Sequence, residues 1–282
     1  MQGNAMRQVC ADLAFAEAPR WHGGALWFSD FYTRRVQRLD PARGELRTVC
    51  EVPGQPSGLG WLPDGRLLVV SMLDRRVLRL ERDGSLAVHA DLSRLASFHC
   101  NDMVVDAAGR AYVGNFGFDL LAKAPPAPAE LVLVQPDGAA RVAARELMFP
   151  NGCVVTPDGG TLVVAETAAK RLTAFDIAPG DGSLSNRRVW AELDALRPDG
   201  ICLDADGAIW CATLRARACV RVREGGALLA RVETAHPCIA CALGGDDGRT
   251  LFVVTGEVSA AEEALARRSA CIWSVRVDVP AA

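Results

Sequence analysis

Hydrophobic and polar positions along this chain alternate in short runs rather than with helical spacing. An apolar strand, a tight turn, a second apolar strand and a third strand of alternating polarity recur six times. The turns contain Asp and Gly, which suit hairpins that need positive φ or a side chain bonded to its own backbone. They lie at 21–24, 63–65, 106–109, 157–159, 204–207 and 246–248. This pattern predicts short β-strands joined by hairpins.

Successive turns lie roughly 40 to 52 residues apart, a spacing typical of propeller blades with four strands each. The sequence therefore predicts an all-β, six-bladed β-propeller with four-stranded antiparallel blades, with residues 1–282 as a single domain. The segment from Arg7 to Phe15 is expected to supply the last strand of blade six and close the ring. A β-sandwich or two stacked barrels would also give many short strands, but six copies in register favour the propeller. Only two stretches, 91–96 and 259–268, have helical character.

Composition narrows the choice of partners. Hydrophobic residues make up 50% of the chain, and the formal net charge of −3 argues against a surface that neutralises phosphates. Neither a secretory signal nor an apolar run long enough to span a bilayer is visible, so a cytoplasmic monomer or weak homodimer without nucleic-acid or membrane partners is expected. Most of the 10 cysteines lie in apolar runs and are interpreted as buried thiols. The single CxxC, Cys238 and Cys241, is interpreted in the same way.

Polar residues stand at the start of four of the six predicted inner strands. The first strand of each propeller blade lines the central channel, so equivalent positions lie around one axis at one height. Alignment on the end of this strand brings Asn101, Asn151 and Asp199 together, with Glu17 one residue out of step. The other two blades have Pro56 and Pro237 at this position. One such residue alone would commonly make only local turn bonds. Four of them, from distant parts of the chain, indicate a functional site.

Carboxylates and carboxamides crowded into a narrow channel indicate a bound cation. Two carboxylates and a carboxamide oxygen repel one another unless positive charge lies between them. Such oxygen-only donors favour Ca²⁺, Mg²⁺ or Mn²⁺, with waters completing the shell. Zn²⁺ is less expected because no His or Cys belongs to the set. We therefore predict one divalent metal ion, with Ca²⁺ as the first candidate.

Several longer motifs carry a family resemblance. Glu-Ala-Pro-Arg-Trp at 17–21, Asn-Asp-Met-Val-Val-Asp-Ala-Ala-Gly-Arg at 101–110, Pro-Asn-Gly at 150–152 and Arg-Pro-Asp-Gly-Ile-Cys-Leu-Asp at 197–204 occur in this order. Over essentially its full length the chain resembles the SMP-30/gluconolactonase family of regucalcin-like proteins. The resemblance implies a six-bladed propeller that hydrolyses aldonolactones and related cyclic esters. It further implies one catalytic divalent metal, with substrate contact from Asn101 and metal ligands at Glu17, Asn151 and Asp199.

The resulting hypothesis is a lactonase that uses metal-activated water. The cation would polarise the carbonyl of a small-molecule lactone, and Asp199 would take the proton of the water as general base. Asn101 and Asp102 would orient the ring hydroxyls. Many sugar-lactone members of the family have Arg two residues before the substrate-binding Asn, where this chain has His99. Imidazole offers fewer donors than guanidinium, so the preferred lactone is expected to differ if His99 contacts substrate rather than only packing.

A long Pro-rich insertion at 116–128 follows the second strand of blade three. Loops at that end of the blade can cover the channel mouth, and Phe118 and Asp119 would then touch substrate. A simple surface loop explains the same composition equally well.

Other classes of function remain open at this point. A non-enzymatic calcium-binding or ligand-sensing propeller would keep the same metal ligands. A scaffold for protein partners would need an exposed aromatic patch, and an aromatic content of 6% weighs against it. Catalysis by a nucleophilic serine or cysteine is not supported, because no Gly-x-Ser-x-Gly occurs and the four histidines lie in unrelated contexts.

Overall fold

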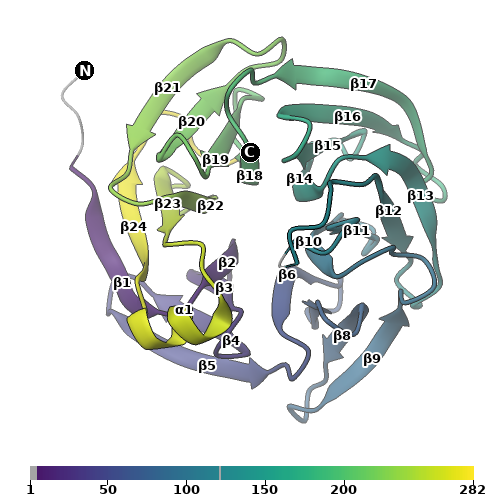
Figure 1. The fold of residues 1–282 in the computed structure, drawn as a ribbon, viewed down its shortest axis with the longest axis horizontal. Helices are drawn as coiled ribbons and strands as arrows, with labels where there is room; N and C mark the ends of the chain where they lie inside the picture. The colour runs from purple at the N-terminus through teal and green to yellow at the C-terminus, as the bar shows by residue number, and fades with distance from the viewer. Residues whose placement is uncertain (1–4, 121) are drawn as a thin grey trace.

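The computed structural model describes residues 5–120 and 122–282, whose strands form six sheets of four strands each. The sheets surround a central channel as the blades of a propeller, with the first strand of each repeat innermost (Figure 1). The prediction of an all-β, six-bladed propeller with four-stranded antiparallel blades is confirmed.

Every blade has the same order from the channel outward. The inner strands of blades one to six are β2 (Ala16–His22), β6 (Pro56–Trp61), β10 (Cys100–Val105), β14 (Pro150–Val155), β18 (Pro198–Leu203) and β22 (Cys238–Gly244). The second strands are β3 (Ala25–Asp30), β7 (Leu67–Ser71), β11 (Ala111–Asn115), β15 (Thr161–Glu166), β19 (Ile209–Thr213) and β23 (Thr250–Thr255). The third strands are β4 (Arg35–Asp40), β8 (Arg76–Leu80), β12 (Ala129–Val134), β16 (Arg171–Ile177), β20 (Ala218–Val222) and β24 (Ala270–Arg276). The outermost strands are β5 (Glu45–Glu51), β9 (Leu86–Asp91), β13 (Ala140–Leu147), β17 (Leu184–Glu192), β21 (Leu228–Glu233) and β1 (Arg7–Leu13).

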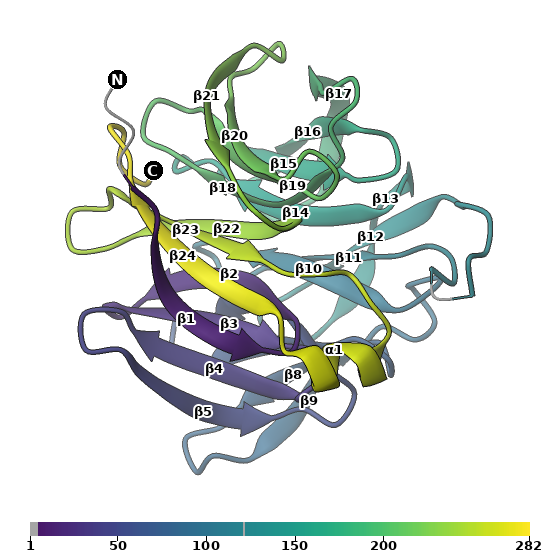
Figure 2. The same cartoon turned by 60° about the vertical axis from the view of Figure 1, so that its left-hand side comes forward.

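Blade six joins the two ends of the chain. Strand β1 pairs antiparallel with β24, with Arg7 opposite Ser274, and lies along the outer edge of that blade (Figure 2). The predicted closure of the ring by the N-terminal segment is therefore confirmed. Closure gives the last sheet its fourth strand and covers the edge that β24 would otherwise present.

Apolar side chains fill the space between neighbouring blades. The second strands are buried almost throughout, and Phe28, Tyr112 and Phe252 are among the largest fully buried side chains. Close packing of this kind holds the inner strands in fixed positions around the channel. All ten cysteines are free thiols, and Cys238 and Cys241 of the CxxC are buried, as predicted.

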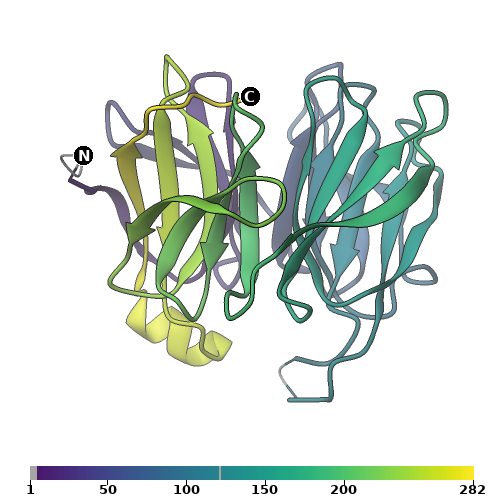
Figure 3. The same ribbon diagram turned by 90° about the horizontal axis from the view of Figure 1, so that it is seen from above.

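The two faces of the propeller differ. We call the face at which the inner strands begin the front face; it also carries α1 (Ala261–Arg267) and the insertion at 116–128 (Figure 3). The Asp-Gly hairpins lie on the opposite, back face, together with the C-terminus. Helix α1 confirms the helical expectation for 259–268, whereas 91–96 forms a single turn in which the Ala96 amide donates to the Leu92 carbonyl. Among the described residues, no helix has the length and apolarity needed to cross a bilayer.

Candidate metal and substrate site in the central channel

Six equivalent positions of the inner strands form a ring around the channel near the front face. The first residue of each inner strand pairs with the last residue of the second strand, as Ala16 does with Asp30 and Cys100 with Asn115. The next residue along each inner strand is the ring position. In blade order the ring consists of Glu17, Ser57, Asn101, Asn151, Asp199 and Ile239.

This register corrects the alignment made from the sequence. Glu17 is in step with Asn101 rather than one residue out, and blade six contributes Ile239 rather than Pro237. The sequence alignment matched Trp21, which lies inside β2, with Asp106, which lies just past the end of β10, so the two anchor residues were not equivalent. The hydrogen-bond register at the beginning of the strand removes that offset.

A β-bulge follows the start of every inner strand. The register shifts between Glu17 and Arg20 in blade one and between Cys100 and Met103 in blade three, and the other four blades shift at the equivalent place. In blade one Ala18 has a positive φ of 47°. A bulge inserts an extra residue and re-aims the side chains beside it, which is why bulges are frequent next to functional sites.

A small residue follows most ring positions because the next inner strand passes close by. A Cβ on Gly152 would lie 2.6 Å from both the Asp199 carbonyl oxygen and the Ile201 nitrogen, and a Cβ on Gly58 would clash with the Met103 nitrogen. These glycines let neighbouring inner strands approach, which brings the ring side chains within reach of one another.

The channel buries more negative charge than positive charge. The residues Glu17, Asp102 and Asp199 are exposed by only 6%, 2% and 4%. Burial, and then the carboxylates of Asp199 and Asp102, raise the pKa of Glu17 well above its usual range. Burial, and then the Asp102 carboxylate, also raise the pKa of Asp199. Bound protons or a bound cation would relieve this repulsion.

One guanidinium enters this cluster. Arg20 Nη2 donates to Asp102 Oδ1 at 2.7 Å and to the Met103 carbonyl at 2.7 Å, and Asp102 Oδ1 also accepts from the Met103 amide. The pair links blades one and three across the channel. Asp102, predicted to orient substrate, thus has protein partners for one of its oxygens. No ion pair reaches Glu17 or Asp199 within the described part of the chain.

One amide oxygen and one carboxylate oxygen of the ring are left without a donor. Asn151 Nδ2 donates to Thr167 Oγ1 at 3.2 Å, and Thr167 Oγ1 donates to the Pro198 carbonyl at 2.7 Å, which fixes the Asn151 amide. The Oδ1 atoms of Asn151 and Asp199 are buried and have no hydrogen-bond partner among the described residues. An orphaned buried oxygen costs about 1–3 kcal/mol, and oxygen donors suit a hard divalent cation. Glu17, Asn151 and Asp199 therefore fit the predicted metal.

Comparison with known proteins agrees with this geometry. The profile of the SMP-30/Gluconolactonase/LRE-like region matches residues 15–257, which contain all six ring positions. The chain belongs to this SMP-30/gluconolactonase family. The resemblance stated from the sequence motifs is confirmed.

Relatives within the SMP-30/gluconolactonase family are similar over most of the chain. The 6-deoxy-6-sulfogluconolactonase of Pseudomonas putida is 27% identical over 275 residues, which cover 94% of this chain and 91% of that protein. Regucalcin of Danio rerio is 26% identical over 274 residues, which cover 92% and 89%. A solved structure of a calcium-binding regucalcin from Agrobacterium tumefaciens has a TM-score of 0.83 at 22% identity and covers 99% of this chain and 96% of its own. That structural likeness shows a shared fold.

Aromatic side chains border the ring on blades three and four of this family member. His99 precedes Asn101 by two residues, and its ring centroid lies 4.2 Å from that of Phe98 and 6.5 Å from that of Phe116. Phe118, from the insertion, meets Phe149 edge to face at 6.0 Å. The insertion, described except for residue 121, therefore packs beside the channel at the front face.

His99 is half-buried and close to Asp119. Burial lowers the pKa of His99, and the Arg75 guanidinium lowers it further. The Asp119 carboxylate opposes them by raising this pKa. A lowered pKa favours the neutral imidazole, which can both donate and accept hydrogen bonds. His99, Phe118 and Asp119, predicted as substrate contacts, are gathered at one side of the channel mouth. Their contact with substrate stays a prediction.

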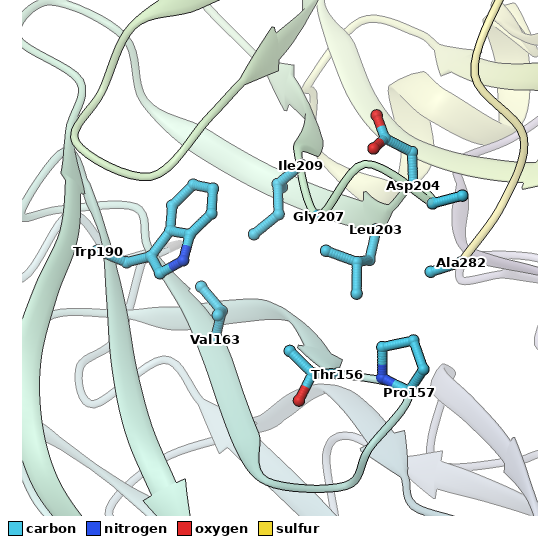
Figure 4. Close-up of a pocket in the computed structure, with 10 residues that line it drawn as sticks. Thr156, Pro157, Val163, Trp190, Leu203, Asp204, Gly207, Ile209 and Ala282 are labelled. Atoms are coloured by element: carbon cyan, nitrogen blue, oxygen red, sulfur yellow. The ribbon is translucent and has the colours of Figure 1, made fainter.

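A hollow on the back face is a different feature. A cavity of about 290 Å³ lies between blades four and five, where Val163, Trp190, Leu203 and Ile209 form an apolar lining beside Ala282 (Figure 4). It contains no ring residue, and it lies at the opposite end of β18 from Asp199. This hollow is therefore separate from the ring.

Ser57 is the ring residue that the sequence interpretation missed. The tripeptide Pro-Ser-Gly at 56–58 matches Pro-Asn-Gly at 150–152 and Pro-Asp-Gly at 198–200, with the ring residue in the middle each time. The Pro-x-Gly pattern was thus visible in three blades. The sequence alignment placed Pro56 at the ring position of blade two, whereas the pairing of Pro56 with Ser71 shows that Ser57 occupies it.

Proposed function

We propose that this protein is a divalent-metal-dependent lactonase that hydrolyses sugar lactones or related cyclic esters. The observation that carries the proposal is the pair of buried, unpartnered Oδ1 atoms of Asn151 and Asp199 in a ring with Glu17. Membership of the SMP-30/gluconolactonase family supports it, as does the similarity to a relative named as a sulfogluconolactonase.

Glu17, Asn151 and Asp199 would hold the metal. Ca²⁺ is the first candidate because all the donors are oxygens, followed by Mn²⁺, Mg²⁺ and Zn²⁺. Such a cation, when bound, polarises an ester carbonyl and makes a coordinated water more acidic.

The remaining chemistry falls to protein side chains. Asp199 would accept the proton of the attacking water while the water oxygen forms a bond to the carbonyl carbon. The bond between that carbon and the ring oxygen then breaks, and the proton passes to the departing alkoxide, which leaves a hydroxy acid. Asn101 stands in the ring beside the metal ligands, where its amide can hold a substrate hydroxyl. His99, Phe118 and Asp119 would contact the part of the substrate nearest the front face.

A panel assay tests the proposal. The purified protein is stripped with a chelator, reloaded with Ca²⁺, Mn²⁺, Mg²⁺ or Zn²⁺, and offered γ- and δ-lactones with and without ring hydroxyls while acid release is followed. Turnover that disappears with chelator and returns with one cation is the expected result. A protein that binds the cation yet opens none of the lactones would instead be a binding or sensing propeller, and the lactonase proposal would be abandoned.

A further inference from the structure

Unpartnered buried oxygens are concentrated in the ring. Four buried side-chain oxygens of the described residues have no hydrogen-bond partner, and they belong to Ser57, Ser71, Asn151 and Asp199. Three of the four are ring residues. A buried polar atom without a partner needs an explanation, because nearly all such atoms in native proteins are satisfied. The metal accounts for Asn151 and Asp199 but leaves Ser57.

Local structure does not use the Ser57 hydroxyl. The carbonyl of Ser57 accepts a hydrogen bond from Ser29 Oγ at 2.6 Å, so the backbone is satisfied while Ser57 Oγ is not. The side chain is 1% exposed, and Gly58 beside it packs against the backbone of Met103. Alanine would fill this place without an orphaned hydroxyl, so packing alone gives no reason for serine.

The position of Ser57 suggests what the hydroxyl meets. Strand β6 lies between β2 and β10, so Ser57 stands in the ring between Glu17 and Asn101 (Figure 1). It is three blades away from Asp199, on the opposite side of the channel. A hydroxyl both donates and accepts hydrogen bonds, which suits the hydroxyl of a sugar ring better than it suits a cation alone.

We propose that Ser57 Oγ binds a ring hydroxyl of the substrate and, with Asn101, selects hydroxylated lactones. This inference rests on the proposed lactonase function and extends it to substrate class. Asn101 and Ser57 hold the polyol side of the ring, while the carbonyl lies toward Asn151 and Asp199. A lactone without hydroxyls would gain nothing from Ser57.

The test compares Ser57→Ala with wild type on two lactones of equal ring size, one polyhydroxylated and one without hydroxyls. Loss of one neutral hydrogen bond predicts a drop of about tenfold in kcat/KM for the hydroxylated lactone only. Calorimetric binding of the matching polyhydroxy acid to the metal-loaded protein should weaken by a similar factor. The melting temperature of the ligand-free variant should not fall, because an unsatisfied buried hydroxyl is removed.

Ser71→Ala is the matched control. Ser71 lies in the same blade, is equally buried at 1% and also has an unpartnered hydroxyl, but it pairs with Pro56 at the end of β7, outside the ring. The Ser71→Ala substitution should leave kcat/KM unchanged for both lactones. Ser57→Cys, which keeps the size but is a poor donor, should behave like Ser57→Ala.

Outcomes separate the two proposals. Equal losses on both lactones, or no loss on the hydroxylated one, would overturn the role of Ser57 while leaving the lactonase intact. If wild type opens no lactone with any cation, the proposed function fails. The role of Ser57 is then tested separately, by calorimetric binding of the polyhydroxy acid. If Ser57→Ala then bound the polyhydroxy acid as tightly as wild type, the proposed role of Ser57 would be rejected.

Discussion

Two aspartates at opposite ends of one strand show how this fold separates structure from chemistry. Asp199 lies near the front end of β18 and Asp204 directly follows its back end, and both are buried. Asp204 Oδ1 accepts from the amides of Asp206 and Ala208, and Oδ2 accepts from Arg221 Nε at 2.6 Å. Asp199 Oδ1 has no donor among the described residues. The oxygens of Asp204 are satisfied within the protein, whereas the buried Oδ1 of Asp199 needs an explanation, which the proposed metal supplies.

The same contrast extends to the two faces. At the back, Asp106 is held by Arg110 at 2.7 Å, in the same way as Asp204 is held by Arg221. At the front, the pKa values of Glu17 and Asp199 are raised by burial and by neighbouring carboxylates. Repetition of one blade thus yields six similar back turns, while the ring is free to vary from Glu17 to Ile239.

The largest expected effect follows from replacing Asp199. Asp199→Ala removes a proposed metal ligand that is also the proposed general base, so kcat/KM for a lactone should fall by about 10³-fold or more. The fold should persist, because the substitution relieves an unpaired buried carboxylate. Steady-state kinetics and circular dichroism on the same preparation check both statements. Substantial residual activity in a well-folded variant would remove Asp199 from the mechanism.

Much of this arrangement could be predicted from the sequence because turn chemistry repeats. The Asp-Gly hairpins marked the blades, and equivalence between blades then placed Asn101, Asn151 and Asp199 on one axis. The offset assigned to Glu17 and the choice of Pro237 were wrong. The back end of an inner strand could not be located to the residue from the sequence: Ala242 lies inside β22, whereas Asp106 lies past the end of β10. The hydrogen-bond register identifies the ring.

Contacts between blades could not be predicted in this way. Arg20 and Asp102 are 82 residues apart, and nothing in either motif states that they pair across the channel. Ser57 has an ordinary side chain whose meaning comes from burial without a partner. Both properties depend on how neighbouring inner strands are packed, which periodicity does not encode.

Breaking the Arg20–Asp102 pair should give the largest loss of stability. Arg20→Met leaves the buried Asp102 carboxylate without its cation, beside Glu17 and Asp199, and removal of one partner of a buried pair costs about 3–5 kcal/mol. Chemical denaturation measures the free energy of unfolding. Asp102→Asn combined with Arg20→Met should recover part of the loss, since the uncompensated charge is gone. A single Arg20→Met variant as stable as wild type would show that the pair is dispensable.

Metal removal should make stability depend on pH in a defined direction. In the folded protein the pKa values of Glu17 and Asp199 are raised above their ordinary values of 4.5 and 3.8. When the pH is above those ordinary values, the metal-free native state therefore binds more protons than the unfolded state. Its free energy of unfolding should therefore fall as pH rises from about 4 through the folded-state pKa values. A cation at 100 times its Kd adds about 2.7 kcal/mol, and its affinity rises with pH because it replaces those protons.

Melting curves at pH 5 and pH 8, with Ca²⁺ or with chelator, check this linkage. The increase in melting temperature caused by Ca²⁺ should be larger at pH 8 than at pH 5. The double variant Glu17→Gln, Asp199→Asn should lose most of this increase and most of the dependence of its metal-free stability on pH. Equal gains at the two pH values in wild type would contradict a carboxylate site with raised pKa.

The smallest effect is expected at the satisfied end of β18. Asp204→Asn keeps an oxygen for the amides of Asp206 and Ala208 and loses only the charge opposite Arg221, whose second partner is Asp206 at 2.9 Å. The free energy of unfolding should fall by about 1 kcal/mol, as for a weakened hydrogen bond to a charged group. Lactone turnover per folded molecule and the gain from Ca²⁺ should equal those of wild type. If Asp204→Asn abolished turnover as Asp199→Ala does, satisfaction of hydrogen bonds would no longer distinguish scaffold from site in this propeller.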